Sequence, residues 1–111
     1  MILAKEVHAL TLLLPRHERF GLTSQINRNV ISIPSNIAEG AGRDTDEQFN
    51  YFLSIAVGSA YELETQLLLC TTFGYLTHDQ IARCLELVRE IQKIIYGLKN
   101  SLILDNKVSS K

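Results

Sequence analysis

Few residues of this chain have the types and the spacing that chemistry requires. Its three histidines, His8, His17 and His78, lie in separate segments, and no glutamate is followed by a histidine three residues later, as in the di-iron sites of helical bundles. The two cysteines, Cys70 and Cys84, form neither a zinc-binding pair nor a disulfide framework. We therefore expect no catalytic residue, no metal, no cofactor and no small-molecule substrate, and a protein that is not an enzyme.

Arginines offer a different chemistry, because guanidinium groups bind the phosphates of nucleic acids. The candidate contacts are Arg16, Arg19, Arg28 and Arg43, of which Arg28 and Arg43 share a polar stripe on one predicted helix. The alternative is that this stripe is a solvated face with a few ion pairs. The formal net charge of −1 argues against a protein that binds any polyanion. Both interpretations stay open.

The charges divide the chain into three parts. Residues 1–43 hold five Lys and Arg against three acidic residues, residues 44–79 hold none against six, and residues 80–111 hold six against three. An acidic central segment thus lies between two basic ones. Either these charges complement one another inside the fold, or oligomerisation gathers the basic segments into a nucleic-acid face.

Composition restricts the class of protein. The 111 residues suffice for one hydrophobic core but not for two, and 46% hydrophobic with 21% charged residues is ordinary for a globular domain. Two prolines, no tryptophan and few β-branched runs favour helices over strands. The sequence has no apolar run long enough to span a membrane and no signal-peptide pattern, and its isolated thiols are typical of a reducing compartment. We expect a cytoplasmic protein with no membrane partner.

Hydrophobic periodicity and end signals predict an all-α fold, an antiparallel up-and-down four-helix bundle with short turns. Pro15 ends the first helix. Thr45 with Gln48, and Thr77 with Gln80, have the spacing of capping boxes. The predicted elements are helices at residues 2–14, 23–40, 45–73 and 78–103, a single domain over residues 1–104 and a frayed polar tail at residues 105–111.

The third predicted helix is apolar on nearly every side. Between Gln48 and Thr77 its only charges are two acidic residues, and Gly74 suits a left-handed C-cap. Three other helices cannot cover all of its large side chains, and an exposed apolar patch of that size favours association. Alternatively, these side chains fill a broad intramolecular core. The candidate oligomer interface consists of Tyr51, Ile55, Val57, Tyr61 and Leu68.

One polar cluster is predicted within the apolar seam between helices. Reflecting the sequence through the turn before the fourth helix places Glu62 near Arg89, and reflecting it through the preceding turn brings Arg28 close to the same carboxylate. We therefore expect Arg28, Glu62 and Arg89 to interact. An ion pair between Glu62 and either arginine would confirm this register of the helices.

Two stretches of the chain closely resemble a known family. They are FGLTSQINRNVISIPSNIAEGAGR and the helix FNYFLSIAVGSAYELETQLLL with the GYL turn that follows it, and the resemblance extends from about Lys5 to about Leu102. The sequence is similar to the small four-helix-bundle family of 23S rRNA intervening-sequence proteins. The combination of IPSNIAEG and GSAYELETQLLL makes the match specific.

The resemblance implies a bundle that assembles into a ring, typically a homopentamer, and an association with RNA. Some relatives are encoded within intervening sequences of large-subunit ribosomal RNA genes, and related accessory proteins of diversity-generating retroelements bind nucleic acid beside a reverse transcriptase. The family has no known set of catalytic residues. Compared with its relatives, this chain has a less basic charge balance and a first helix about two turns shorter, which would leave the far ends of the other helices less covered.

Two functions are consistent with these observations. The first is a non-enzymatic, ring-forming adaptor associated with RNA or a ribonucleoprotein, whose partners are copies of itself and RNA or a nucleic-acid-processing protein. The second is an oligomeric protein scaffold that binds no nucleic acid. Salt-dependent binding to structured RNA distinguishes the two.

Overall fold

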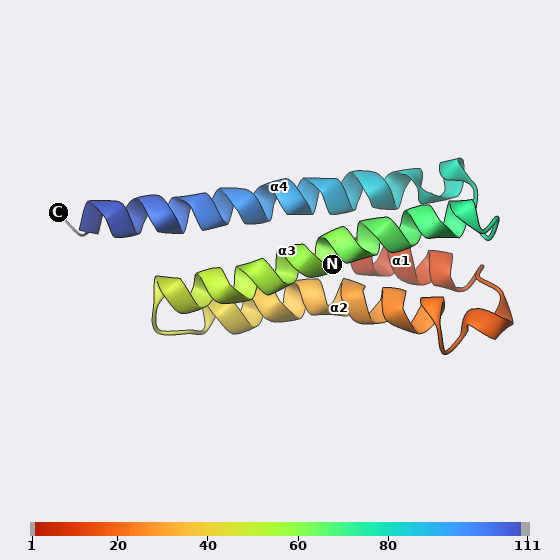
Figure 1. Cartoon of the computed structure of the whole chain (residues 1–111), viewed down its shortest axis with the longest axis horizontal. Coiled ribbons are helices and arrows are strands. Elements are labelled where there is room, and N and C mark those ends of the chain that lie inside the picture. The colour runs from red at the N-terminus through yellow and green to blue at the C-terminus, as the bar shows by residue number, and fades with distance from the viewer. Residues whose placement is uncertain (1, 110–111) are drawn as a thin grey trace.

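The computed structural model describes the backbone of residues 2–109 and the side chains of residues 2–104. Within this range the chain forms four α-helices and no strand, so the predicted all-helical fold is confirmed (Figure 1). The elements are α1 (Ile2–Thr11), the 3-10 helix η1 (Arg16–Glu18), α2 (Leu22–Ala41), α3 (Asp46–Thr72) and α4 (His78–Ser109).

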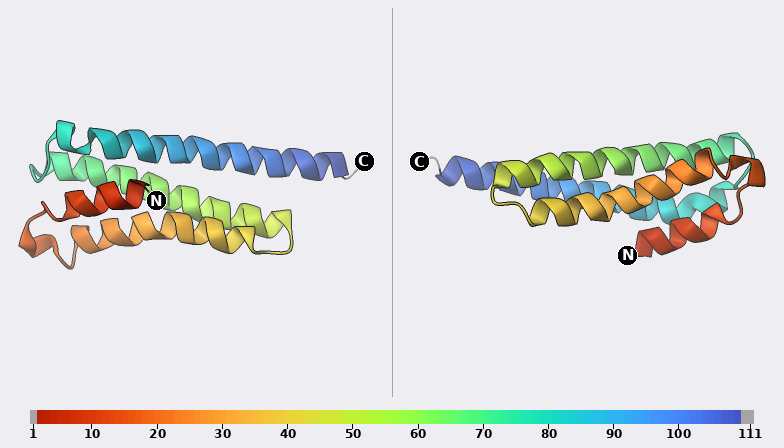
Figure 2. Two further views of the ribbon diagram at one scale, coloured as in Figure 1. Left: turned by 180° about the vertical axis from the view of Figure 1, so that it is seen from behind. Right: turned by 90° about the horizontal axis from the view of Figure 1, so that it is seen from below.

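Successive helices run antiparallel along an elongated bundle of 55 × 23 × 20 Å (Figures 1 and 2). α3 packs against α2 and α4 on one side of the bundle, and α1 packs against the same two helices on the other side, with no Cα atom within 8 Å of one in α3. One long face of α3 therefore has no covering helix within the described chain. α1 extends along only one half of the bundle, whereas α4 continues past the α2–α3 turn (Figure 1).

An apolar groove continues beyond the start of α1, where α2 and α4 flank an open space of about 380 Å³. No charged residue lines it. This is the less covered region that a short first helix predicts. The groove, called the α2–α4 groove below, is lined by Ile33, Pro34, Ile37, Ala38, Ala41, Ile91, Ile94, Ile95 and Leu98.

The hydrophobic core draws on all four helices. Its fully buried large side chains include Val7 of α1, Ile26 of α2, Leu63 of α3 and Val88 of α4. Both cysteines are free and buried within it, and burial raises the pKa of each thiol to about 11. The cysteines are therefore packing residues, protonated at neutral pH.

α3 and α4 each begin with one of the predicted capping boxes. The Thr45 hydroxyl accepts a hydrogen bond from the backbone N–H of Gln48 at 3.1 Å. Thr77 and Gln80 form the complete reciprocal box, with bonds of 3.1 Å to the Thr77 hydroxyl and 2.8 Å to the Gln80 side-chain oxygen. These bonds satisfy backbone donors that the first turn of a helix leaves without partners.

The turn between α3 and α4 depends on Gly74, which has a φ of 76° as predicted for a left-handed C-cap. The N–H of Tyr75 bonds the carbonyl of Cys70 at 2.9 Å, and the N–H of Gly74 bonds that of Thr71 at 3.0 Å. This pair of bonds is the Schellman motif. Only glycine adopts such a φ without steric cost, so this residue fixes the direction in which α4 leaves.

Two helix ends differ from the prediction. α1 ends at Thr11 instead of residue 14, because the backbone N–H groups of Leu13 and Leu14 bond carbonyls three residues back rather than four. Pro15 disfavours helical geometry directly before it, which accounts for the early end. α4 continues to Ser109 instead of ending near residue 103, since no glycine or proline follows Gly97. The backbone that was predicted to fray is therefore helical through Ser109, and residues 110–111 lie outside the described range.

Candidate functional site

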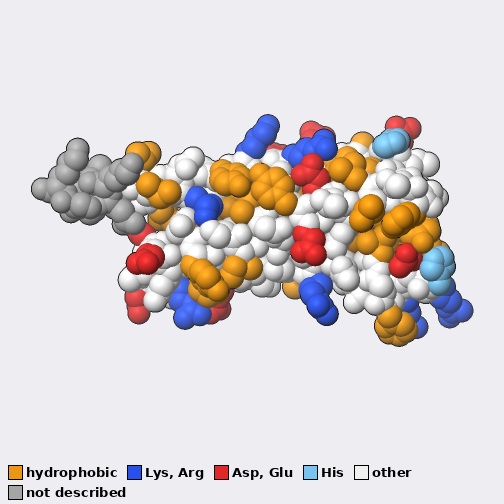
Figure 3. All heavy atoms as spheres, viewed as in Figure 1, with side chains coloured by type: hydrophobic (Ala, Val, Ile, Leu, Met, Phe, Trp, Pro, Cys, Tyr) orange, Lys and Arg blue, Asp and Glu red, His pale blue; other side chains and the backbone are white. Residues whose placement is uncertain are grey.

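The uncovered face of α3 carries large apolar side chains. Tyr51 is 62% exposed and Phe73 is 54% exposed, and Ile55 and Leu69 between them are also exposed. Figure 3, which looks onto α3, shows such side chains as separate hydrophobic patches along the molecule. Between Tyr51 and Phe73 this face has no lysine or arginine, and its one charged residue is Glu62, which is exposed and lies within about 20° of Tyr51 and Leu69 around the helix. We call Tyr51, Ile55, Leu69 and Phe73, with Gly58 among them, the α3 outer face.

The predicted oligomer interface agrees only in part with this arrangement. Val57 is only 7% exposed, so it belongs to the core of its own chain and offers little surface to a second copy. Tyr61 and Leu68 are exposed, but Tyr61 lies on the flank of α3 beside Tyr96 of α4. Leu69 and Phe73 were not among the predicted interface residues, but their spacing from Tyr51 and Ile55 repeats the helical period and places them on the same line of α3.

Gly58 lies in the middle of the α3 outer face. A Cβ added there would meet no atom within 4 Å among the described residues, so nothing inside the chain requires glycine. A glycine within a helix costs about 1 kcal/mol relative to alanine. Its other effect is to let a second backbone approach closely at this point.

The four candidate arginines do not form one site on a single chain. Arg16 lies in η1 at one end of the bundle, and Arg43 follows α2 at the opposite end (Figure 1). Arg19 lies over the ring of Phe20, which is 88% exposed, with 5.3 Å from the guanidinium carbon to the ring centroid. Arg28 is exposed on α2.

Arg43 is engaged by its neighbours. It pairs with Glu39, four residues back near the end of α2, and its guanidinium carbon lies 4.9 Å from the ring centroid of Phe52. The interaction with Glu39 is the local ion pair that the solvated-face alternative predicted. Both charged side chains are about half exposed, so the pair contributes little to stability.

The predicted cluster of Arg28, Glu62 and Arg89 does not form. Glu62 is exposed and has no ion pair among the described residues, whereas Arg89 donates from Nε to Glu64 Oε2 at 2.9 Å. Glu64 is two residues further along, which is about 200° around the helix, and this rotation turns Glu62 away from α4. Gln92 donates to the other oxygen of Glu64 at 2.8 Å, and this bond above all holds the pKa of that carboxyl below its usual range.

The polar contact between α2 and α3 is instead a neutral amide pair. Asn29 Nδ2 donates to Gln66 Oε1 at 3.0 Å, and both side chains are buried. Ser32 and Ser59 add a hydroxyl contact of 2.9 Å further along the same seam. The sequence analysis missed these residues because it considered only charged side chains as partners.

His17 and Glu18 connect η1 to the α3–α4 turn. The Tyr75 hydroxyl donates to Glu18 Oε2 at 2.9 Å and lies 3.2 Å from His17 Nε2. The other oxygen of Glu18 accepts the backbone N–H of Leu22, and this bond is the main reason that the pKa of the Glu18 carboxyl is lowered. The cluster joins segments far apart in the sequence, and it includes no nucleophile.

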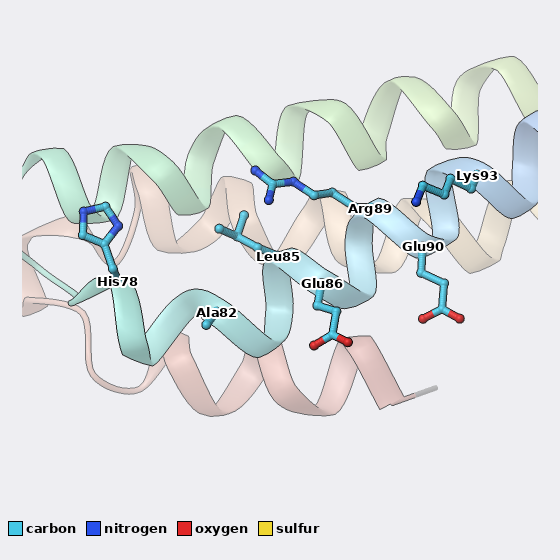
Figure 4. Close-up of a pocket in the computed structure, with 7 residues that line it drawn as sticks. All are labelled: His78, Ala82, Leu85, Glu86, Arg89, Glu90 and Lys93. Carbon is cyan, nitrogen blue, oxygen red and sulfur yellow. The ribbon is translucent and has the colours of Figure 1, made fainter.

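The charged side chains along α4 are mixed. Arg89, Lys93, Glu86 and Glu90 line one pocket, in which Arg89 reaches toward α3 and Glu86 points toward the side on which α1 lies (Figure 4). Among the described residues no group of three or more His, Cys, Asp or Glu side chains is placed to hold a metal ion. Of these four side chains, Arg89 makes an ion pair across to α3, through Glu64.

Comparison with known proteins identifies a family. The model of a family described as 23S rRNA-intervening sequence protein matches residues 1–97. No curated protein matches the chain. Within the described residues, none of the helices combines the length and the apolar character that crossing a membrane requires.

Proposed function

We propose that this chain, which belongs to the 23S rRNA-intervening sequence protein family, forms a homopentameric ring and serves as a non-enzymatic adaptor associated with RNA or a ribonucleoprotein. The observation that carries this proposal is the α3 outer face. The family resemblance supplies the expectation of a ring and of RNA, and the structure supplies a surface suited to assembly.

The α3 outer face has the character of an interface core. Aromatic residues are enriched and charged residues are depleted at the centres of protein interfaces, and here Tyr51 and Phe73 lie on a helix segment without lysine or arginine. Gly58 allows the backbone of a neighbouring chain to come close. A ring needs heterologous contacts, in which this face meets a different surface of the next copy. The apolar α2–α4 groove is such a surface.

Assembly also bears on the RNA contacts. On one chain Arg16 and Arg19 are far from Arg43, so phosphate contacts at one point would be few. A ring repeats each of these arginines around its axis, and a repeated set can follow an RNA backbone over a greater length. These side chains are the proposed phosphate contacts, together with Arg28.

A second candidate is an oligomeric scaffold that binds only proteins. It is favoured by the formal net charge of −1 and by the interleaving of acidic and basic side chains on the face shown in Figure 3. The ring would be the same in both cases, and only the partner would differ.

Native mass spectrometry at micromolar concentration tests the assembly. We expect a particle with five times the 12.5 kDa mass of the chain. Leu69→Lys should dissociate it, because an ammonium group would be buried without a partner. Leu12→Lys, at an exposed position in the turn after α1, is the control and should leave the ring intact. A monomeric wild type contradicts the ring, and a Leu69→Lys ring contradicts the assignment of the α3 outer face.

Fluorescence anisotropy with a labelled structured RNA tests the partner. The adaptor function predicts binding that weakens as salt increases, and that is lost in the double variant Arg28→Glu/Arg43→Glu while the ring persists. If the wild type does not bind at low salt, the protein-only scaffold is the better description.

A further inference from the structure

α3 and α4 flank a shallow groove of about 730 Å³. The groove differs from the α3 outer face, since it lies on the flank of α3 rather than on the uncovered side. Among the residues that line it are Tyr61, Arg89, Lys93, Tyr96, Gly97 and Asn100.

Two tyrosines provide aromatic surface in this groove. Tyr61 and Tyr96 come from different helices, each is 44% exposed, and their ring centroids lie 6.4 Å apart at an interplanar angle of 55°. The tilt leaves ring surface open to the groove. Exposed aromatic rings of this kind are the platforms on which single-stranded nucleic acids stack their bases.

Gly97 leaves the space beside Tyr96 open. A Cβ at this position would meet no atom within 4 Å, so glycine is not needed for packing within the described chain. In the middle of a long helix glycine costs about 1 kcal/mol relative to alanine. Its effect is to leave room for a planar ring next to Tyr96, and the Asn100 amide one turn away lines the same groove as a hydrogen-bonding group.

The charges of the groove favour an anionic partner. Arg89 and Lys93 line the groove, and Lys99 reaches Ser54 further along the same seam. The carboxylate in the groove, Glu64, already accepts hydrogen bonds from Arg89 and Gln92. Phosphates bound in the groove would therefore lie near basic side chains, and the carboxylate there is already paired.

We propose that the α3–α4 groove binds single-stranded RNA, with a base stacked on Tyr61 and Tyr96 in the space left by Gly97 and with phosphates at Arg89 and Lys93. This inference rests on the proposed association with RNA and names the surface that makes the contact. It specifies single strands, because the bases of a duplex are not free to stack on protein rings.

Anisotropy with fluorescently labelled twelve-nucleotide oligo(U) and oligo(A), at low salt, tests the groove. Tyr96→Leu should weaken binding roughly 5- to 150-fold, the range measured when one base loses its stacking partner, while Tyr96→Phe should bind like the wild type. Gly97→Leu fills the groove and should abolish binding although it raises the melting temperature, because leucine is the better helix former. Ser101→Leu places the same side chain at an exposed position one turn further along α4. It should change both the binding and the melting temperature less than Gly97→Leu does.

The outcomes separate this inference from the proposed function. If the wild type binds the oligonucleotides and Gly97→Leu and Tyr96→Leu bind equally well, the groove is not the site, while the association with RNA stands. A loss shared by Ser101→Leu would assign the effect to the helix as a whole and would also overturn the groove. If the wild type binds neither these oligonucleotides nor structured RNA at low salt, the adaptor function fails, and the groove fails with it.

Discussion

Replacing Gly40 with alanine tests how closely α2 and α3 pack near the turn that joins them. A Cβ at Gly40 would lie 2.8 Å from Phe52 Cβ, 2.9 Å from Phe49 Cδ1 and 3.3 Å from the Phe49 carbonyl oxygen. The Phe52 Cβ is attached directly to the backbone and cannot rotate away. The two helices must therefore move apart to admit one methyl group.

Two opposing free energies determine the result. Alanine stabilises a helix by about 1 kcal/mol relative to glycine. Overpacking of a close contact costs about 1 to 3 kcal/mol. The difference predicts a net loss of about 1 kcal/mol in the free energy of unfolding, which lowers the melting temperature by about 4 to 8 °C for a domain near this size.

The matched control is Gly97→Ala. Its Cβ would meet no atom within 4 Å, so only the helix-forming gain applies and the melting temperature should rise. Circular dichroism at one fixed protein concentration measures both variants, since self-association makes the melting temperature depend on concentration. An equal rise for Gly40→Ala and Gly97→Ala would refute the close packing of α2 on α3.

Three further predictions concern the polar and thiol groups. In a double-mutant cycle, Asn29→Ala and Gln66→Ala should show a coupling of about 1 kcal/mol in urea unfolding, and independent effects would mean that the buried amide bond is absent. Folding lowers the pKa of the Glu18 carboxyl below the ordinary value of 4.5. The ionised carboxylate therefore stabilises the protein above pH 4.5, and this stabilisation is lost as the pH falls through the pKa of the folded state. Thermal unfolding should show that Glu18→Gln loses less stability in acid than the wild type does. Cys70 and Cys84 should resist iodoacetamide at pH 8 until the protein unfolds, because both are buried and their pKa values are about 11, and rapid alkylation of the native protein would contradict that burial.

The helices were predictable from the sequence because their signals are local. Thr77 and Gln80 make the reciprocal bonds that their spacing indicates, and Gly74 has the positive φ that a C-cap at this position needs. Each of these signals involves residues within one or two turns of each other. The resemblance to the family predicted the same fold independently. The match of the family model to residues 1–97 confirms that the chain belongs to this family.

The pairing of side chains across helices was not predictable to the same precision. Reflecting a sequence through a turn locates a partner only to within a few residues, because the turn geometry sets the register. In a helix an error of two residues rotates a side chain by about 200°, which is why Arg89 contacts Glu64 and not Glu62. Val57 is buried and Tyr61 is exposed although they are only about 40° apart around α3, so the boundary between core and flank falls between them.

Position around the helix also determines which of the two proposed surfaces of α3 a side chain belongs to. Leu69 points away from the chain on the outer face, whereas Tyr61 turns toward Tyr96 of α4, so a variant at one surface leaves the other unchanged. In the proposed ring, each copy would present one α3–α4 groove, and a long single strand that occupies several grooves would gain from their high effective concentration. In this proposal the net charge of −1 does not prevent binding, because Arg89 and Lys93 line the groove itself and its carboxylate, Glu64, is paired with Arg89.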